Sequence, residues 1–196
     1  MGDDFFVVLA LGDSLTAGYR TRDLYAMDPR IPYPAQLEAL LRKKIGTEKQ
    51  VFVINAGVNG DFIEGMLRRF RHVVELEKPD FCVVWGGIPD ISAGRRTENI
   101  MENLATLYSL CVEFSATPVA CTLTPTRYTS PAMRCLNNQI KSHASKKDII
   151  LTDLFPPLAD EEGNLRQEYN DDDVHLPPLG YRCVAEKVFD SIASQL

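Results

Sequence analysis

The run from Phe5 to Leu11 is the feature that most constrains the fold of this chain. It contains only Phe, Val, Leu and Ala, and a strand without any polar position is typical of a parallel sheet that is covered on both faces. The run ends at Gly12-Asp13-Ser14. Because ligands of such sheets bind beyond the carboxyl ends of the strands, Ser14 stands where a nucleophile would lie. Gly, Asp and Ser are also ordinary residues of a turn between a strand and a helix.

Four further strand-like segments follow, and helix-like segments separate them. Strands that alternate with helices predict an α/β fold, a three-layer α/β/α sandwich with a central, parallel, five-stranded sheet of flavodoxin-like type. We expect residues 1–196 to form a single domain, because one core suffices at this length. The remaining strands are expected at Val51–Ile54, Phe81–Trp85, Pro118–Leu123 and Asp148–Leu154.

Several expected helices carry start signals. Ser130-Pro131 has the residue types of an N-cap and a first helical position. Asp61 and Glu64 have the spacing of a capping pair, which predicts a helix that begins at Asp61. The closing helix has an apolar stripe of Tyr181, Val184, Val188 and Ile192.

The composition excludes several functions. The net charge is −6 and the pI is about 5.1, which argues against nucleic acid or an anionic membrane as the main partner. No apolar run approaches the roughly 18 residues of a spanning helix, so we expect no integral membrane segment. Asp3 and Asp4 replace the positive start of a secretory signal. The sequence therefore predicts a cytoplasmic protein, and nothing in it defines an oligomeric state.

The five cysteines agree with that location. They are odd in number and widely spread, and no pair has the spacing of a zinc site or a redox motif. We interpret them as small buried apolar residues.

A candidate base for Ser14 lies near the far end of the chain. A serine hydroxyl is a weak nucleophile until a base takes its proton, and that base needs a third group to hold its tautomer. Asp172 precedes His175 by three residues, so one tight loop could supply both groups. The alternatives are an acidic loop that happens to contain a histidine, and a metal site formed by Asp171, Asp172, Asp173 and His175, although no calcium-loop pattern accompanies them.

Taken together, Gly12-Asp13-Ser14-Leu15 and Asp172-x-x-His175 resemble the GDSL, or SGNH, hydrolase family. Asn55-x-Gly57-x-x-Gly60-Asp61 resembles the second block of that family, and the residues from His175 to Tyr181 resemble its last block. The resemblance implies a catalytic triad of Ser14, Asp172 and His175, and backbone N–H groups of Ser14 and Gly60 as the oxyanion hole. Without the resemblance, Gly60 would be interpreted as a turn glycine.

The third block departs from the family. The family usually has Gly-x-Asn-Asp there, with the Asn side chain as a further oxyanion donor, whereas this chain has Gly87-Ile88-Pro89-Asp90. Proline has neither a side-chain donor nor a backbone N–H. Asn59 is a possible substitute donor, but no spacing argument places its side chain at the oxyanion.

We expect a serine ester hydrolase that cleaves small acyl esters or thioesters through an acyl-enzyme, without a cofactor or a metal. The motif Gly-Asp-Ser-Leu-Thr-Ala-Gly-Tyr is similar to members that act as arylesterases, thioesterases or lysophospholipases. Asp13, Trp85 and Pro89 are expected at the substrate site, with a place in the core as the alternative for Trp85. The alternative function is a catalytically weak or inactive protein of the same fold that binds an acyl or sugar ligand, and Pro89 is the residue that favours it.

Overall fold

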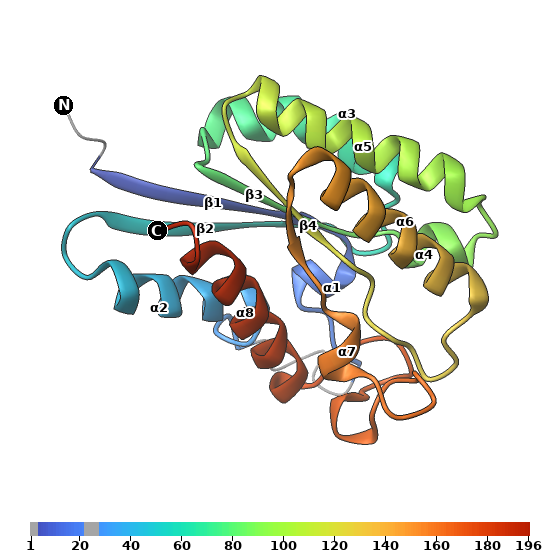
Figure 1. Cartoon of the computed structure of the whole chain (residues 1–196). Coiled ribbons are helices and arrows are strands. Elements are labelled where there is room, and N and C mark those ends of the chain that lie inside the picture. Colours follow the sequence, from blue (N-terminus) through green and yellow to red (C-terminus); the bar gives the residue numbers. More distant parts are fainter. Residues whose placement is uncertain (1–3, 22–27) are drawn as a thin grey trace.

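A parallel sheet forms the centre of the computed structural model, which describes residues 4–21 and 28–196. The order of its strands is β2, β1, β3, β4 and β5 (Figure 1). This is the fold predicted from the sequence, with five parallel strands flanked by helices. The bounds are Phe5–Gly12 for β1, Gln50–Gly57 for β2, Phe81–Trp85 for β3, Thr117–Cys121 for β4 and Ile150–Thr152 for β5.

Strand β1 lies inside the sheet because it pairs with β2 on one side and β3 on the other. Its residues from Val8 to Leu11 are fully buried, as expected for an uncharged strand with both faces covered. Gly12 lies opposite Gly57 of β2 and Trp85 of β3. The three strands therefore end level with one another, and the loops that follow them begin at the same edge.

Helices cover both faces of the sheet (Figure 1). One face carries α2 (Tyr33–Ile45) and α8 (Pro178–Ala193), which pack against each other. The other face carries α3 (Ile63–Glu77), α5 (Thr97–Glu113) and α6 (Pro131–Lys147), with α5 in contact with both neighbours. Four short elements follow strand ends or precede α8: α1 (Ser14–Ala17), α4 (Ile88–Ser92), α7 (Phe155–Leu158) and the 3₁₀ helix Gln167–Tyr169.

The predicted apolar stripes face the sheet. The four stripe residues of α8 are all fully buried, and they join the same cluster as the strands. Ser130 caps α6, as predicted, because its hydroxyl accepts the amide N–H of Met133 at 3.3 Å.

The predicted bounds of β2, β4 and β5 are wrong. β2 is longer than expected and spans Gln50–Gly57 instead of Val51–Ile54. β5 is shorter than expected because Asp148 has a left-handed backbone conformation, φ 54°, and closes α6 instead of beginning the strand. Asp153 ends the strand by turning its carboxylate to the hydroxyl of Thr122 at 2.9 Å. The fourth strand spans Thr117–Cys121, two residues short of the expected end at Leu123.

Within residues 4–21 and 28–196, no helix is both long and apolar enough to cross a membrane. Asp3, which formed part of the argument against a secretory signal, lies outside those residues.

Candidate active site

The turn after β1 (residues 12–14, the serine turn) holds Ser14 at the first position of α1. Asp13 caps this short helix, because its Oδ1 accepts the amide N–H of Leu15 at 3.0 Å. Gly12 leaves room for the turn, since a Cβ at this position would lie 2.1 Å from Oγ1 of Thr16. The residue types of the turn thus let the chain reverse tightly and bring Ser14 out at the carboxyl edge of the sheet.

The loop that precedes α8 (residues 170–176, the histidine loop) brings Asp172 and His175 to that edge. Oδ1 of Asp172 accepts the amide N–H of His175 at 2.8 Å, so the carboxylate folds back onto the residue three positions later. Nδ1 of the imidazole lies 2.8 Å from Oδ2 and 3.0 Å from Oδ1 of the same carboxylate. The spacing of three residues therefore aims one carboxylate at both the backbone and the ring of His175.

The other ring nitrogen faces the serine turn. Nε2 of His175 lies 2.9 Å from Oγ of Ser14, across 161 residues of sequence. The ring of Tyr19 packs against the imidazole with 4.7 Å between the ring centroids. The Tyr19 carbonyl in turn accepts the hydroxyl of Tyr181 at 2.7 Å. The imidazole is thus held by a carboxylate, a hydroxyl and an aromatic ring.

The electrostatics at Asp172 favour an ionised carboxylate. Burial acts to raise its pKa, but the hydrogen bonds from the backbone and ring of His175 outweigh burial, and the pKa lies below its usual value. Asp172 is therefore charged at neutral pH, which suits a group that stabilises a protonated imidazole.

The three adjacent aspartates point to different partners. Asp171 accepts the amide N–H and the hydroxyl of Thr21 at 2.7 and 2.9 Å. Asp173 pairs with the Arg127 guanidinium at 3.2 Å. Of the three carboxylates, it is that of Asp172 that reaches His175. No group of three or more metal-ligating side chains occurs in the described parts of the chain.

The turn after β2 (residues 58–61, the Gly60 turn) lies beside the serine turn. The amide of Val58 donates to the carbonyl of Gly12 at 3.1 Å, and the amide of Asp61 closes the turn on the Val58 carbonyl at 3.1 Å. Gly60 has a φ of 71°, a left-handed conformation that favours glycine. Asn59 is exposed in this turn.

The capping pair predicted from Asp61 and Glu64 is wrong. Helix α3 begins at Ile63, and the amide of Ile63 donates to Oδ2 of Asp90 at 3.1 Å. Asp61 instead pairs with Arg69 at 2.9 Å. Gly60 is therefore three residues before the helix, in a turn, and not directly at its N-terminus.

Pro89 and Trp85, which were both expected at the substrate site, differ in burial. Pro89 is half-buried at the second position of α4, where a fixed φ and a missing N–H are tolerated. Trp85 is only 1% exposed, and its ring meets the Tyr33 ring edge-on at 5.6 Å between centroids. Of the two roles considered for Trp85, the packing favours the core.

Asp13 is also buried, with 1% of its surface exposed, and it caps α1 rather than facing a substrate. Burial raises the pKa of Asp13 to about 7; the Leu15 amide opposes this rise, and the nearby carboxylates of Asp90 and Asp61 add to it. Burial also raises the pKa of Asp90, against the Ile63 amide and Arg95. The floor of the site therefore contains carboxyl groups that resist ionisation.

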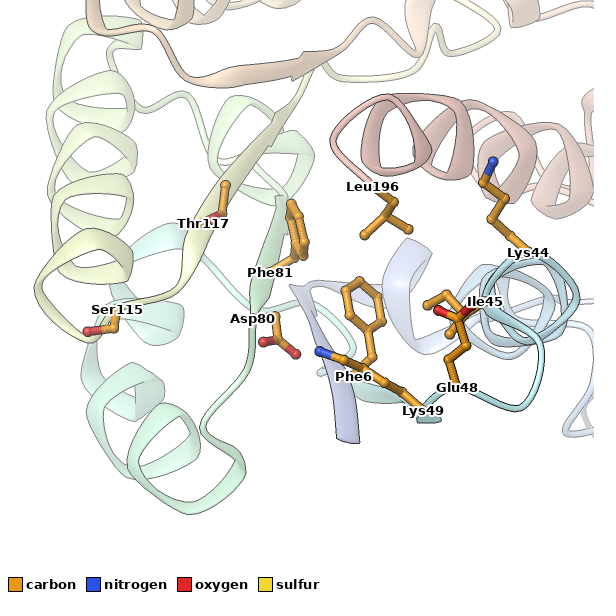
Figure 2. A pocket seen from close by; sticks show the side chains of 10 residues that line it. All are labelled: Phe6, Lys44, Ile45, Glu48, Lys49, Asp80, Phe81, Ser115, Thr117 and Leu196. Atoms are coloured by element: carbon orange, nitrogen blue, oxygen red, sulfur yellow. The ribbon is translucent and has the colours of Figure 1, made fainter. Parts of the chain in front are cut away.

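A hollow of about 320 Å³ adjoins the histidine loop. Its wall combines the apolar side chains of Ile88, Ile91, Met133 and Val174 with polar ones that include the Arg127–Asp173 ion pair. A second hollow, of about 500 Å³, lies at the opposite edge of the sheet, where Figure 2 shows side chains from the starts of β1, β3 and β4. Sheets of this type bind their ligands at the carboxyl edge, so the hollow beside the histidine loop is the candidate substrate pocket.

A parallel α/β sheet with serine, histidine and carboxylate in hydrogen-bond contact beyond its carboxyl edge has the arrangement of a serine hydrolase. The model of the GDSL-like lipase/acylhydrolase family matches residues 10–183. The chain belongs to this family, which confirms the resemblance found in the sequence and makes the protein a carboxylic ester hydrolase. A comparison with curated proteins finds no significant match.

Several solved structures have the same fold over nearly the whole chain. A lipase/acylhydrolase from Enterococcus faecalis is 24% identical, with a TM-score of 0.77 and 97% of both chains covered. The acetyl xylan esterase AlAXEase is 22% identical, with a TM-score of 0.78, 95% of this chain and 100% of that chain. The psychrotrophic esterase EstA from Pseudoalteromonas sp., inhibited by monoethylphosphonate, is 18% identical, with a TM-score of 0.75 and 96% and 97% covered.

Sequence reasoning missed three residues of this region. Tyr19 packs on His175, Asp90 accepts the first amide of α3, and Arg69 contacts both Asp61 and the carbonyl of Gly12. Arg69 lies between Arg68 and Arg71 in the sequence, and the pattern alone places all three on the outer face of the helix. Its spacing of eight from Asp61, which would place both on one face of the helix that the sequence predicts from Asp61, is the signal that would have set it apart.

Proposed function

We propose that this chain hydrolyses small acyl esters or thioesters through a triad of Ser14, His175 and Asp172 and a covalent acyl-enzyme. One observation carries the proposal. Nε2 of His175 lies 2.9 Å from Oγ of Ser14 while Nδ1 lies 2.8 Å from the Asp172 carboxylate. These distances allow proton transfer from the serine without any rearrangement.

In the proposed reaction, Oγ of Ser14 attacks the acyl carbon as Nε2 of His175 takes its proton. Asp172 keeps Nδ1 protonated and stabilises the imidazolium. His175 then gives its proton to the leaving alcohol or thiol, and the acyl group stays on Ser14. Water, deprotonated by the same imidazole, releases the acid. Every group transferred is a proton or an acyl group, so the reaction requires no cofactor.

The oxyanion that forms at the acyl oxygen needs donors. We assign the backbone N–H groups of Ser14 and Gly60 to this role. Ser14 is the first residue of α1, and the first amides of a helix have no partner within it. Pro89 adds no donor, and Asn59 remains the candidate substitute.

The hollow beside the histidine loop supports a short acyl or aryl group as the bound part of the substrate. Its volume, about 320 Å³, is at the lower end of the range for small-molecule sites. The apolar part of the wall, formed by Ile88, Ile91, Met133 and Val174, would contact a hydrocarbon group, and with the family-like Gly12–Tyr19 motif it supports a lipid-like or aryl ester rather than a decorated polysaccharide.

Steady-state hydrolysis of p-nitrophenyl esters from acetate to palmitate tests the proposal. We expect wild-type turnover that is highest for short chains, and loss of nearly all turnover in Ser14→Ala with an unchanged circular dichroism spectrum. Wild-type activity that survives Ser14→Ala would contradict the triad, and a preference for palmitate would contradict the substrate class.

A second candidate function is ligand binding with little or no turnover. Pro89 favours it, because losing one oxyanion donor typically lowers the rate by about 10²–10³. A folded wild type that binds a short-chain ester but does not cleave it would support this candidate over the enzyme.

We also propose a cytoplasmic location. All five cysteines are free thiols. Cys82, Cys111 and Cys121 are buried as expected, but Cys135 is exposed and Cys183 is half-buried, so the interpretation as buried residues is wrong for these two. Unpaired cysteines are typical of a reducing compartment. Fractionation of the cells that express the protein tests this point, and recovery outside the cytoplasm would overturn it.

A further inference from the structure

The proposed oxyanion donors come from two different loops. Ser14 belongs to the serine turn after β1, and Gly60 belongs to the Gly60 turn after β2. The ladder between these strands ends at Gly12 and Gly57, so sheet hydrogen bonds do not extend to either donor. Beyond the ladder, one backbone hydrogen bond, from the amide of Val58 to the carbonyl of Gly12, joins the two turns, and it holds only the start of the Gly60 turn.

The guanidinium of Arg69 spans that gap. Its Nε donates to Oδ2 of Asp61 at 2.9 Å, and its Nη2 donates to the carbonyl oxygen of Gly12 at 3.0 Å. The side chains of Arg69 and Asp61 are 23% and 15% exposed. Hydrogen bonds between ionised groups that are largely shielded from water are stronger than those between neutral groups.

The carbonyl oxygen of Gly12 is thereby connected by hydrogen bonds to both ends of the Gly60 turn. The amide of Val58, at the start of the turn, donates to Gly12 directly. Asp61, at its end, is tied to the same oxygen through Arg69. Gly60 lies between these two attachments, and Gly12 is two residues before Ser14.

A glycine in α3 leaves room for the contact between Asp61 and Arg69. Asp61, Gly65 and Arg69 are spaced four apart and share one face of the chain as it enters α3. A Cβ at Gly65 would lie 1.9 Å from Oδ1 of Asp61. Glycine at this position therefore leaves space for the Asp61 carboxylate to lie over the first turn and reach the guanidinium.

We propose that Arg69 is a positioning residue that sets the register of the Gly60 turn against the serine turn and so aligns the two oxyanion donors. The inference rests on the proposed function, in which Gly60 is one of those donors. Removal of Arg69 should therefore weaken the stabilisation of the transition state more than the binding of the substrate, since a misplacement of about 1 Å in a catalytic group lowers rates by up to about 100-fold.

Arg69→Gln and Arg69→Lys separate charge from geometry. Glutamine removes the charge, whereas lysine keeps it but lacks the planar fork that bonds two acceptors at once. With p-nitrophenyl acetate we expect kcat to fall by about 10- to 100-fold in both variants, with KM changed by less than about 3-fold. Arg68→Gln is the matched control, because Arg68 is 70% exposed and pairs with Glu64 on the outer face. We expect it to keep wild-type kinetics.

Gly65→Ala provides a second test that a loss of stability cannot mimic. The added methyl group displaces the Asp61 carboxylate from Arg69, while alanine favours the helix more than glycine does. We therefore expect a lower kcat, by about 10-fold, in a variant that is fully folded at the assay temperature by circular dichroism. A kcat equal to that of the wild type in this variant would count against the role of the Asp61–Arg69 contact.

A transition-state mimic separates the oxyanion donors from the triad. A trifluoromethyl ketone adds to the nucleophile and places an oxyanion in the hole, so its affinity should fall in Arg69→Gln by the same factor as kcat/KM. The acidic limb of the pH profile should stay in place, because the hydrogen bonds of Arg69 go to Asp61 and Gly12 and not to the proposed triad.

The possible outcomes are distinct. A wild type without turnover would overturn the proposed function and this inference with it. A wild type that turns over, combined with Arg69 variants whose kcat and inhibitor affinity stay within about 2-fold, would overturn the positioning role alone. A parallel loss of kcat and inhibitor affinity with an unchanged pH limb would support it.

Discussion

Replacing Asp13 with asparagine should make the stability of this protein less dependent on pH. The Asp13 carboxyl is buried, and its pKa is raised from 3.8 to about 7, chiefly by burial. In the unfolded chain the group would ionise near its ordinary pKa. Between about pH 4 and pH 7 the unfolded chain therefore releases a proton that the folded protein retains, so folding stability falls as the pH rises through this window.

The size of the effect follows from the difference between the two pKa values. About three pH units at about 1.4 kcal/mol each give a loss on the order of 4 kcal/mol from pH 4 to pH 8. Asparagine in place of Asp13 cannot ionise, and its carbonyl oxygen can still accept the amide of Leu15. Its NH₂ group replaces Oδ2, which has no hydrogen-bond partner within the described residues, and an unpaired buried donor costs about 1–3 kcal/mol. The net gain expected for the variant at pH 8 is therefore about 1–3 kcal/mol.

Urea denaturation of both proteins at several pH values between about 4.5 and 8 measures this effect. The single tryptophan, Trp85, lies in the core and reports unfolding by its fluorescence. The other titrating groups are common to both proteins, so they largely cancel in the difference between the two free energies of unfolding. We expect that difference to shift in favour of Asp13→Asn as the pH rises. A difference that is independent of pH would refute the raised pKa of Asp13.

Three further predictions concern the site and the core. Asp172→Asn should lower kcat by up to about 10⁴-fold. Asp171→Asn and Asp173→Asn should change kcat little, because asparagine keeps a hydrogen-bond acceptor at position 171 and tolerates the φ of 78° at position 173. Steady-state kinetics measure all three variants, and a larger loss of kcat in either neighbour than in Asp172→Asn would contradict the assignment. Pro89→Asn should raise kcat/KM for a small activated ester by about 10-fold, because the asparagine side chain can add an oxyanion donor and its position in α4 is compatible with asparagine. An unchanged kcat/KM in a folded variant would show that the third oxyanion donor is elsewhere. Trp85→Ala should lower the free energy of unfolding by about 3–5 kcal/mol, and a loss below about 1 kcal/mol would contradict its place in the core.

Local sequence signals predicted the parts of the fold that local chemistry decides. The uncharged run of β1 predicted a strand with both faces buried inside a covered sheet, and the residue types of Gly12-Asp13-Ser14 predicted a tight turn after it. The spacing of three between Asp172 and His175 fixed which of three aspartates faces the imidazole, because a tight turn returns the chain at that interval.

Other contacts depend on residues that are distant in the sequence, and no local pattern reveals them. Asp61 has the spacing of a helix cap, yet it pairs with Arg69 because Gly65 leaves room for it and Gly12 offers a second acceptor. Once Asp61 is engaged there, Asp90 from the next strand end accepts the first amide of α3. The choice between these partners is made by packing.

Trp85 illustrates the same limit. A large aromatic residue at the end of a strand can line a pocket or fill the core, and composition does not decide between them. The Tyr33 ring, supplied by α2, decides for the core. Tyr19 reaches His175 in the same manner, from a loop whose sequence carries no signal for the contact.

In the proposed mechanism, His175 and Asp172 activate Ser14 as a nucleophile. Reaction of the native protein with a fluorophosphonate, followed by peptide mass spectrometry, shows whether Ser14 is activated, because such probes react much faster with an activated serine than with an ordinary one. We expect one adduct, on Ser14, that disappears in Ser14→Ala and forms much more slowly in His175→Ala. An adduct on another serine, or no adduct on the folded wild-type protein, would contradict it.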